Sequence, residues 1–274
     1  MTVEEVYRRP EDYELETLAR DIGDLPFWQR LLQRERPVRV LEIGSGCGRL
    51  TIPLARQGAG QRFTITGLEM EPKMLCRAEE HARAESAATQ RALRLALGDA
   101  RDLDAALQRL GADASAQPFD VILMPFGVAH HLTTVDDQLS AWRGARRWLR
   151  PGGLLAVDVA APDLPRLVAG LRHATPRQPD LEVSREGRTL RRTVATRYHA
   201  AIQQETLVYE YHVSEPDGGQ RDYRSTFAQY VYFPHELELL FRATGFTLER
   251  LLGSYSGATY GPRSALLLAL GRAI

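Results

Sequence analysis

Hydrophobic and polar residues follow two alternating patterns between residues 38 and 160. Short, almost wholly apolar runs, typical of buried strands, are separated by longer segments in which apolar residues recur every three or four positions, as in amphipathic helices. The apolar runs are 38–41, 63–68, 93–97, 119–124 and 154–159. The helical segments between and after them are 49–57, 72–85, 103–110 and 136–149. This alternation predicts an open, mostly parallel sheet with helices on both faces.

The pattern differs on either side of this region. Asp24 and Pro26 predict the start of a helix over residues 27–33, with Asp24 as its N-cap and Pro26 in its first turn. Residues 181–233 contain runs of strand character, and a turn at Pro216-Asp217-Gly218-Gly219 separates the last two, which indicates an antiparallel meander. The three runs are 192–198, 207–213 and 226–233.

The last part of the chain returns to the α/β pattern, with a helix expected from Pro234 to Gly245 and strands expected near 247–252 and 265–270. We therefore predict an α/β fold: a Rossmann-like, doubly wound, seven-stranded, mostly parallel sheet with an inserted antiparallel β meander. The expected domains are an N-terminal helical segment over residues 1–37, a core over residues 38–162 plus 234–274, and an inserted subdomain over residues 163–233.

A glycine-rich loop follows the first predicted strand, and it is the strongest indication of chemistry in the chain. Residues Glu42 to Gly48 read E-I-G-S-G-C-G. Glycine allows both the tight turn and the close approach of a ligand to the backbone. The dinucleotide-binding pattern is G-x-G-x-x-G. Here Arg49 stands where the third glycine of that pattern would lie, so a site for NAD or a nucleotide sugar is disfavoured.

Polar residues also follow the next three predicted strands, and the carboxyl ends of parallel strands meet at one edge of a sheet. Glu69 could accept the hydroxyls of a ribose, or, with Glu71, could simply open a helix. Asp99 could accept the amino group of adenine, or could cap a helix, a role that we assign to Asp102. Phe126 follows the fourth strand, where an acceptor would meet the cofactor.

Composition and charge restrict the partners. The chain has 274 residues, with 35 Lys plus Arg and 35 Asp plus Glu, so neither nucleic acid nor an anionic membrane is expected as the main partner. Two cysteines indicate neither a disulfide framework nor a metal cluster. The sequence shows no apolar run long enough to span a membrane and no signal-peptide pattern at residues 1–13. We expect a cytoplasmic protein.

Taken together, these motifs resemble those of bacterial class I S-adenosylmethionine (SAM) methyltransferases, particularly small-molecule N-methyltransferases of antibiotic and amino-sugar biosynthesis. The resemblance is clear over residues 38–160, and Cys47 stands where the family commonly has Thr. The motifs that carry it are Glu42–Gly48, Glu69 with Met74-Leu75, Gly98-Asp99-Ala100, Pro125-Phe126-Gly127, His131-Leu132, Asp137-Gln138-Leu139 and Leu149-Arg150-Pro151-Gly152-Gly153.

The resemblance implies SAM as cofactor, with S-adenosylhomocysteine (SAH) as product. It also implies that the N-terminal segment closes over the cofactor, so that Tyr13 reaches its carboxylate or the substrate. Within the family, the three glycines of the loop pack against the methionine part of SAM, Glu69 binds ribose and Asp99 binds adenine. The cofactor-binding residues that we expect are Tyr13, Glu42, Gly44, Ser45, Gly46, Gly48, Glu69, Met70, Gly98, Asp99, Ala100 and Met124.

In-line methyl transfer requires alignment and exclusion of water more than a strong base. The resemblance, together with the lack of a clear base, favours transfer to a nitrogen of a small molecule, and we expect Phe126 to form a wall of the acceptor site. The alternative is transfer to oxygen, with His130 or His131 as the base; transfer to carbon is a further one. An RNA or protein substrate, or a SAM-binding protein without catalysis, is less favoured. The meander could line the substrate site or form a homodimer interface, and we expect no metal.

Overall fold

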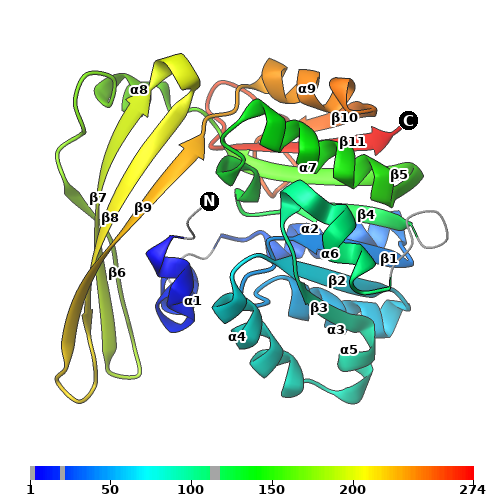
Figure 1. Ribbon diagram of the computed structural model, residues 1–274, viewed down its shortest axis with the longest axis horizontal. Helices are drawn as coiled ribbons and strands as arrows, with labels where there is room; N and C mark the ends of the chain where they lie inside the picture. The colour runs from blue at the N-terminus through cyan, green and yellow to red at the C-terminus, as the bar shows by residue number, and fades with distance from the viewer. Residues whose placement is uncertain (1–3, 19–21, 112–117) are drawn as a thin grey trace. The chain divides into compact units, whose positions relative to one another are not determined.

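The computed structural model describes residues 4–18, 22–111 and 118–274 of the chain. These residues form two compact units, each with its own sheet. One unit contains the N-terminal residues up to Ile22 together with Pro162–Val231, and the other contains Gly23–Ala161 together with Tyr232–Ile274 (Figure 1).

The larger unit contains a seven-stranded sheet with the order β10-β11-β5-β4-β1-β2-β3. Strands β1 to β5 are parallel, and β11 runs antiparallel to both of its neighbours. The predicted seven-stranded, mostly parallel, doubly wound sheet is therefore confirmed. The strands are β1 (Arg39–Ile43), β2 (Thr64–Glu69), β3 (Leu93–Leu97), β4 (Phe119–Met124), β5 (Leu149–Ala160), β10 (Phe246–Leu252) and β11 (Leu266–Ala273).

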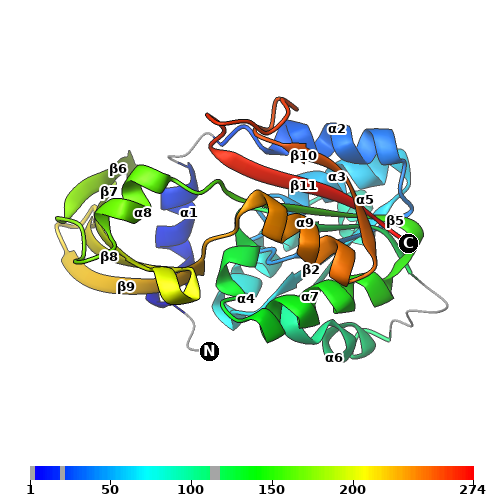
Figure 2. The ribbon, with the colours of Figure 1, turned by 90° about the horizontal axis from the view of Figure 1, so that it is seen from above.

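Helices cover both faces of this sheet. Figure 2 shows α2 and α3 on one face and α7 and α9 on the other. Because side chains alternate along a strand, Val40 packs in one core with Trp28, while the equally buried Leu41 points to the opposite face. The helices are α2 (Leu25–Glu35), α3 (Thr51–Gln61), α4 (Pro72–Arg83), α5 (Ala87–Ala92), α6 (Leu103–Gln108), α7 (Val135–Trp148) and α9 (Pro234–Ala243), with short 3-10 turns η2 (Ala100–Asp102) and η3 (Val128–His131).

Asp24 stands at the N-cap position of α2, but its side chain does not cap the helix. Both of its carboxylate oxygens instead accept hydrogen bonds from the Arg49 guanidinium, each at 2.8 Å. The predicted capping role is therefore wrong. A buried, bidentate, charge-assisted pair is stronger than a cap bond to a neutral N–H, and Asp24 is only 2% exposed. The pair ties the start of α2 to the residue that follows the glycine loop.

The smaller unit contains a four-stranded antiparallel sheet with the order β6-β7-β8-β9. The predicted meander is present, and its turn at residues 216–219 joins β8 to β9. The sequence pattern missed β6, whose residues are mostly exposed and in which only Leu181 and Val183 are apolar and pack against the core of the sheet. The elements are η1 (Glu5–Arg8), α1 (Pro10–Leu18), α8 (Leu164–Ala169), β6 (Gln178–Arg185), β7 (Arg188–His199), η4 (Ala200–Ile202), β8 (Gln204–Ser214) and β9 (Gln220–Tyr230).

Buried acidic residues of α1 attach this helix to the four-stranded sheet. Asp12 is 0% exposed and accepts hydrogen bonds from Arg188 at 2.6 Å and from Arg221 at 2.7 and 2.9 Å. Glu16, one turn later, pairs with Arg192. The N-terminal segment predicted over residues 1–37 thus divides: residues 4–18 belong to the smaller unit, and residues from 23 onward belong to the larger one.

Residues 1–3 and 19–21 of that predicted segment lie outside the described residues. The closure of the N-terminal segment over the cofactor stays a prediction, as does a homodimer interface on the meander.

The buried ion pairs of α1 give a prediction on stability. Asp12→Ala should lower the free energy of unfolding by about 1–3 kcal/mol, because Arg188 and Arg221 lose their buried partner and keep only Glu215. Urea unfolding followed by circular dichroism would measure this loss. The control is Glu182→Ala, which removes an exposed pair with Arg191 and should leave the free energy of unfolding nearly unchanged. Equal losses in the two variants would contradict the structural importance of Asp12.

Candidate functional site

The glycine loop between β1 and α3 has a backbone that only glycine adopts easily. Gly44, Gly46 and Gly48 all have positive φ angles, of 76°, 56° and 85°. A Cβ atom on Gly44 would lie 2.3 Å from Cγ2 of Val128, and one on Gly48 would lie 2.7 Å from Cδ1 of Ile52. Side chains are therefore excluded at both positions, and the absence of a Cβ lets the loop pack closely against Val128 and Ile52.

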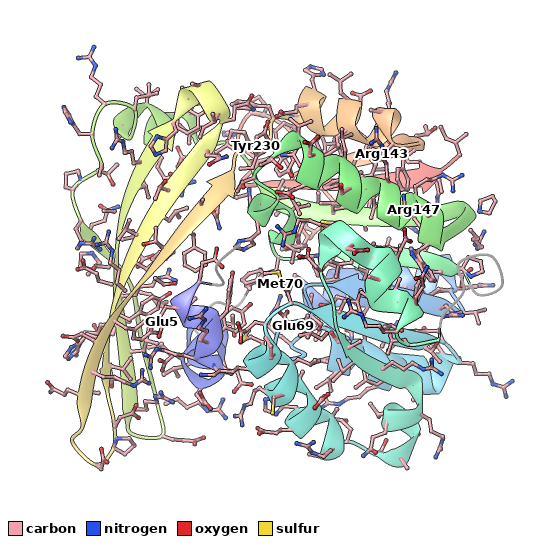
Figure 3. The ribbon with its side chains drawn as sticks, viewed as in Figure 1. Glu5, Glu69, Met70, Arg143, Arg147 and Tyr230 are labelled. Carbon is pink, nitrogen blue, oxygen red and sulfur yellow. The ribbon has the colours of Figure 1, made fainter. Side chains whose placement is uncertain are left out.

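The carboxylate of Glu69 joins this loop to the carboxyl end of β2, where Figure 3 labels it beside Met70. Its Oε2 accepts the Gly46 N–H at 2.8 Å, and its Oε1 accepts the N–H groups of Met70 and Glu71 at 2.9 and 2.8 Å. Burial raises the pKa of Glu69, against these hydrogen bonds, which lower it. Three of the four lone-pair positions are used, so one position, on Oε2, remains for a ligand hydroxyl.

Asp99 and Asp102 both act as caps after β3. Asp99 caps η2 through the Arg101 N–H at 2.9 Å, and its two oxygens also pair with the Arg101 guanidinium. Burial alone would raise the pKa of Asp99, but the bonds from Arg101 outweigh it and leave the pKa below its usual value. Asp102 caps α6 through the Ala105 N–H at 3.0 Å, as the sequence predicts. An adenine amino group would share Asp99 with Arg101.

Glu42 lies in β1, beneath the glycine loop, and is only 2% exposed. Its Oε2 accepts a hydrogen bond from the Thr51 hydroxyl at 2.7 Å. Burial raises the pKa of Glu42 to about 8, although this hydrogen bond and the charge of Arg49 lower it. The side chain is therefore largely protonated at neutral pH, and it serves as an uncharged polar residue under the loop.

The remaining predicted cofactor residues of the larger unit also lie at strand ends. Met70 and Gly98 follow β2 and β3, and the Gly98 N–H donates to the Glu69 carbonyl at 2.9 Å. Ala100 opens η2, and Met124 is the last residue of β4, fully buried. Tyr13 belongs to the smaller unit, where its ring packs against Tyr7, at 5.7 Å between centroids, and against the apolar core of the four-stranded sheet.

Phe126 follows β4 in a conformation that is rare for an aromatic residue. Its φ is 57°, and the next residue, Gly127, has a φ of 72°. Such strained residues are found where neighbouring groups fix them, often at functional sites. The Arg49 guanidinium lies 4.8 Å from the centre of the Phe126 ring, a cation–π contact. Phe126 stays a predicted wall of the acceptor site.

The two candidate bases lie next to each other on η3 in different environments. His130 is 8% exposed, and its Nε2 accepts a hydrogen bond from the Ala160 N–H at 2.9 Å. Nε2 therefore cannot receive a proton from an acceptor molecule while this bond exists. His131 is more exposed. Of the two, the geometry favours His131 as a base, whereas His130 connects η3 to the end of β5.

Sequence reasoning missed two buried groups at this edge of the sheet: the Asp24–Arg49 pair, and Asp158 with Tyr255. Asp158 is 0% exposed and lies in β5. A charged residue within the apolar run Leu154–Val159 was the signal that could have identified it, because an isolated charge is rarely buried without a partner. The partner of Asp158, Tyr255, lies about a hundred residues away in the chain, so the sequence offered no sign of it.

Comparison with known proteins agrees with this geometry. Residues 41–155 match a family model described as a methyltransferase domain. This match covers less than half of the chain. Together with the class I strand order, it supports the prediction of a SAM-dependent methyltransferase. A search of curated proteins gives no match.

Solved methyltransferase structures share the fold. The CcbJ methyltransferase from Streptomyces caelestis is 24% identical, with 91% of this chain and 89% of that chain covered and a TM-score of 0.69. CalS10, an amino pentose methyltransferase from Micromonospora echinaspora, is 20% identical, with 96% of each chain covered and a TM-score of 0.67. The sugar N-methyltransferase KedS8 from Streptoalloteichus sp. is 20% identical, with 98% and 94% covered and a TM-score of 0.66.

The residues at these strand ends are compatible with SAM, the predicted cofactor. Gly44 and Gly46 in the loop are partly exposed, and Glu69 retains a lone pair for a hydroxyl. The Ser45 hydroxyl is buried without a hydrogen-bond partner among the described residues, and a buried polar group of this kind normally has one. No helix within the described ranges is long and apolar enough to cross a membrane.

The raised pKa of Glu42 predicts how stability depends on pH. The folded state retains the proton of Glu42 up to about pH 8, whereas the unfolded chain releases it near 4.5. Ionisation therefore favours unfolding, and the free energy of unfolding falls as pH rises through this window. At about 1.4 kcal/mol per pH unit, the loss is at most about 5 kcal/mol. Urea unfolding across the window measures it.

Glu42→Gln keeps an acceptor for the Thr51 hydroxyl but cannot ionise, so this variant should lose most of the pH dependence between about pH 6 and 8, above the range in which Asp158, with a pKa raised by burial to about 6, contributes. The matched control, Glu79→Gln, changes an exposed residue of α4 and should retain the wild-type slope. A slope unchanged in Glu42→Gln would show that the pH dependence arises elsewhere.

Proposed function

We propose that this methyltransferase transfers the methyl group of SAM to a nitrogen atom of a small-molecule amine of specialised metabolism. The observation that carries the choice of nitrogen is the hydrogen bond from the Ala160 N–H to Nε2 of His130, at 2.9 Å. This bond occupies Nε2 of His130, which is the more buried of the two candidate bases. An amine brings its own lone pair, whereas an alcohol or phenol benefits from a base. The fold shared with an amino pentose methyltransferase and a sugar N-methyltransferase supports the same choice.

The proposed cofactor site lies at the carboxyl ends of β1, β2 and β3. The backbone of Gly44, Gly46 and Gly48 would lie along the methionine part of SAM, Glu69 would accept a ribose hydroxyl, and Asp99 would accept the adenine amino group. When bound, SAM supplies a methyl group on a positively charged sulfur. The contacts of Glu69 support this proposal, because its carboxylate already connects the ends of the first two strands.

The proposed acceptor site lies at the carboxyl end of β4, beside the glycine loop. Phe126 would form an apolar wall there, excluding water and orienting the nitrogen toward the methyl group. Alignment of this kind can supply a large part of the rate enhancement. The product amine loses its proton to solvent or to His131, so no strong base is needed.

Cofactor binding tests the first part of the proposal. Calorimetric titration with SAH should give a Kd that is about 10- to 100-fold weaker in Glu69→Gln and in Asp99→Asn than in the wild type, about 1.4–2.8 kcal/mol. Each substitution removes a negative acceptor without changing size. Asp102→Asn is the matched control, because Asp102 caps α6 in the same turn and should leave the Kd within about 2-fold.

Failure of the wild type to bind SAH would remove the basis for the proposed cofactor site. Equal weakening by Asp99→Asn and Asp102→Asn would show that the turn after β3 matters only as a capped helix start, and that Asp99 does not bind adenine.

The nature of the acceptor atom is tested by His131→Asn. With primary and secondary amines as acceptors, we expect kcat to fall less than about 3-fold, because the amine needs no general base; a general base typically contributes about 100- to 10,000-fold. Steady-state kinetics with an amine series and a phenol series measure both cases. Activity on phenols alone, abolished in His131→Asn, would instead support O-methylation with His131 as the base.

A further inference from the structure

Asp158 is a fully buried carboxylate that the proposed methyl transfer does not use directly. It lies two residues before the end of β5, and its Oδ1 accepts the N–H of Gly127 at 3.0 Å. Its Oδ2 accepts a hydrogen bond from the Tyr255 hydroxyl. Tyr255 lies in the connection between β10 and β11, and its ring packs against Phe27 and Trp28, with centroids 5.9 and 6.3 Å away. The Asp158–Tyr255 pair is thus held by Gly127 on one side and by the rings of Phe27 and Trp28 on the other.

Asp158, which accepts both of these hydrogen bonds, lies against the strained turn after β4. Phe126 and Gly127 both have left-handed φ angles, 57° and 72°. An aromatic residue keeps such a conformation only when its surroundings hold it there. The Gly127 N–H points to Asp158, to Oδ1 at 3.0 Å and to the backbone carbonyl at 3.2 Å. Asp158 therefore fixes the orientation of the peptide that joins Phe126 to Gly127.

A second buried carboxylate acts on the same turn through an arginine. Asp24 binds both terminal nitrogens of Arg49 at 2.8 Å, and this guanidinium lies 4.8 Å from the centre of the Phe126 ring. The ring is thus held by Arg49, while the peptide after it is held by Asp158. Two separate contacts thus hold the strained turn, one on the Phe126 ring and one on the Gly127 N–H.

The turn also touches the glycine loop. Val128, the residue after Gly127, lies so close to Gly44 that a Cβ atom there would be 2.3 Å from its Cγ2. Movement of the turn would therefore change the distance between the proposed acceptor wall and the proposed cofactor loop. In-line transfer is sensitive to displacements of about 1 Å, which can cost roughly 100-fold in rate.

We infer that Asp158 and Tyr255 are positioning residues for methyl transfer, which hold the Phe126–Gly127 turn against the glycine loop so that acceptor and methyl donor are aligned. The inference rests on the proposed function for its kinetic consequence. Neither side chain needs to touch the reactants, because both act through the backbone of Gly127.

This role of Asp158 predicts that kcat depends on pH. Burial raises the pKa of Asp158 to about 6, although the bonds from Tyr255 and Gly127 lower it. The charged groups that face Asp158 are Asp24, which raises its pKa, and Arg49, which lowers it. Below about pH 6 the carboxylate gains a proton and its charge-assisted bonds weaken. The turn should then be held less firmly, and kcat should fall.

The test compares the wild type with Tyr255→Phe and Asp158→Asn. Tyr260→Phe is the matched control, because Tyr260 lies in the same connection and its hydroxyl makes no hydrogen bond within the described part of the chain. With an amine acceptor, both test variants should lose about 10- to 100-fold in kcat, while the Kd for SAH stays within about 2-fold. The fall in kcat below about pH 6 should be absent in Asp158→Asn.

Hydrogen–deuterium exchange of a peptide spanning residues 125–128 provides a readout that does not depend on activity. Exchange of the Gly127 amide should be faster in both test variants than in Tyr260→Phe. Unchanged kcat in Tyr255→Phe, or unchanged exchange at Gly127, would overturn the inference. The two ideas fail in different ways. If the wild type binds SAH but methylates no amine, the proposed function is contradicted. If the Gly127 amide nevertheless exchanges faster in the two variants, the positioning of the turn by Asp158 and Tyr255 is retained.

Discussion

The three hydrogen bonds accepted by the Glu69 carboxylate are the interaction on which the rest of the site depends. They join the N–H of Gly46, in the loop after β1, to the N–H groups of Met70 and Glu71, after β2. Two loops far apart in sequence are thereby fixed to one side chain. The glycine loop in turn contacts Val128, in the turn after β4. The carboxyl ends of three strands thus form one connected set of backbone groups before any ligand arrives, and preorganisation of this kind is what methyl transfer requires.

Buried carboxyl groups around this set have different protonation states because their surroundings differ. Glu42 receives one hydroxyl bond, and burial raises its pKa to about 8. Asp158 receives two bonds and has a pKa of about 6. Asp24 is paired with the Arg49 guanidinium. None of the three is placed as the acid or base of a reaction. They fix the loop, the turn after β4 and the start of α2, which agrees with catalysis by alignment more than by proton transfer.

The sequence allowed prediction of the sheet, the glycine loop and the placement of Glu69 and Asp99 at strand ends, because each depends on local pattern and on the geometry of parallel strands. It did not reveal contacts between distant segments. Asp24 looked like a cap because its partner, Arg49, belongs to another helix start. The left-handed conformation of Phe126 has no signal in residue type, since aromatic residues rarely adopt it. Strand β6 escaped detection because only two of its residues, Leu181 and Val183, form its apolar face, which is too short a pattern to indicate a strand.

The most direct test of the central claim is a crystal structure of the protein with SAH bound. The account predicts the ribose on Oε2 of Glu69, the methionine part along Gly44 to Gly48, and a glycine loop whose left-handed φ angles are unchanged by the ligand. The three backbone bonds to Glu69 should also persist. A ligand bound away from β1 and β2, or a glycine loop that rearranges around it with loss of the Gly46 bond, would contradict a site that is built in advance around this carboxylate.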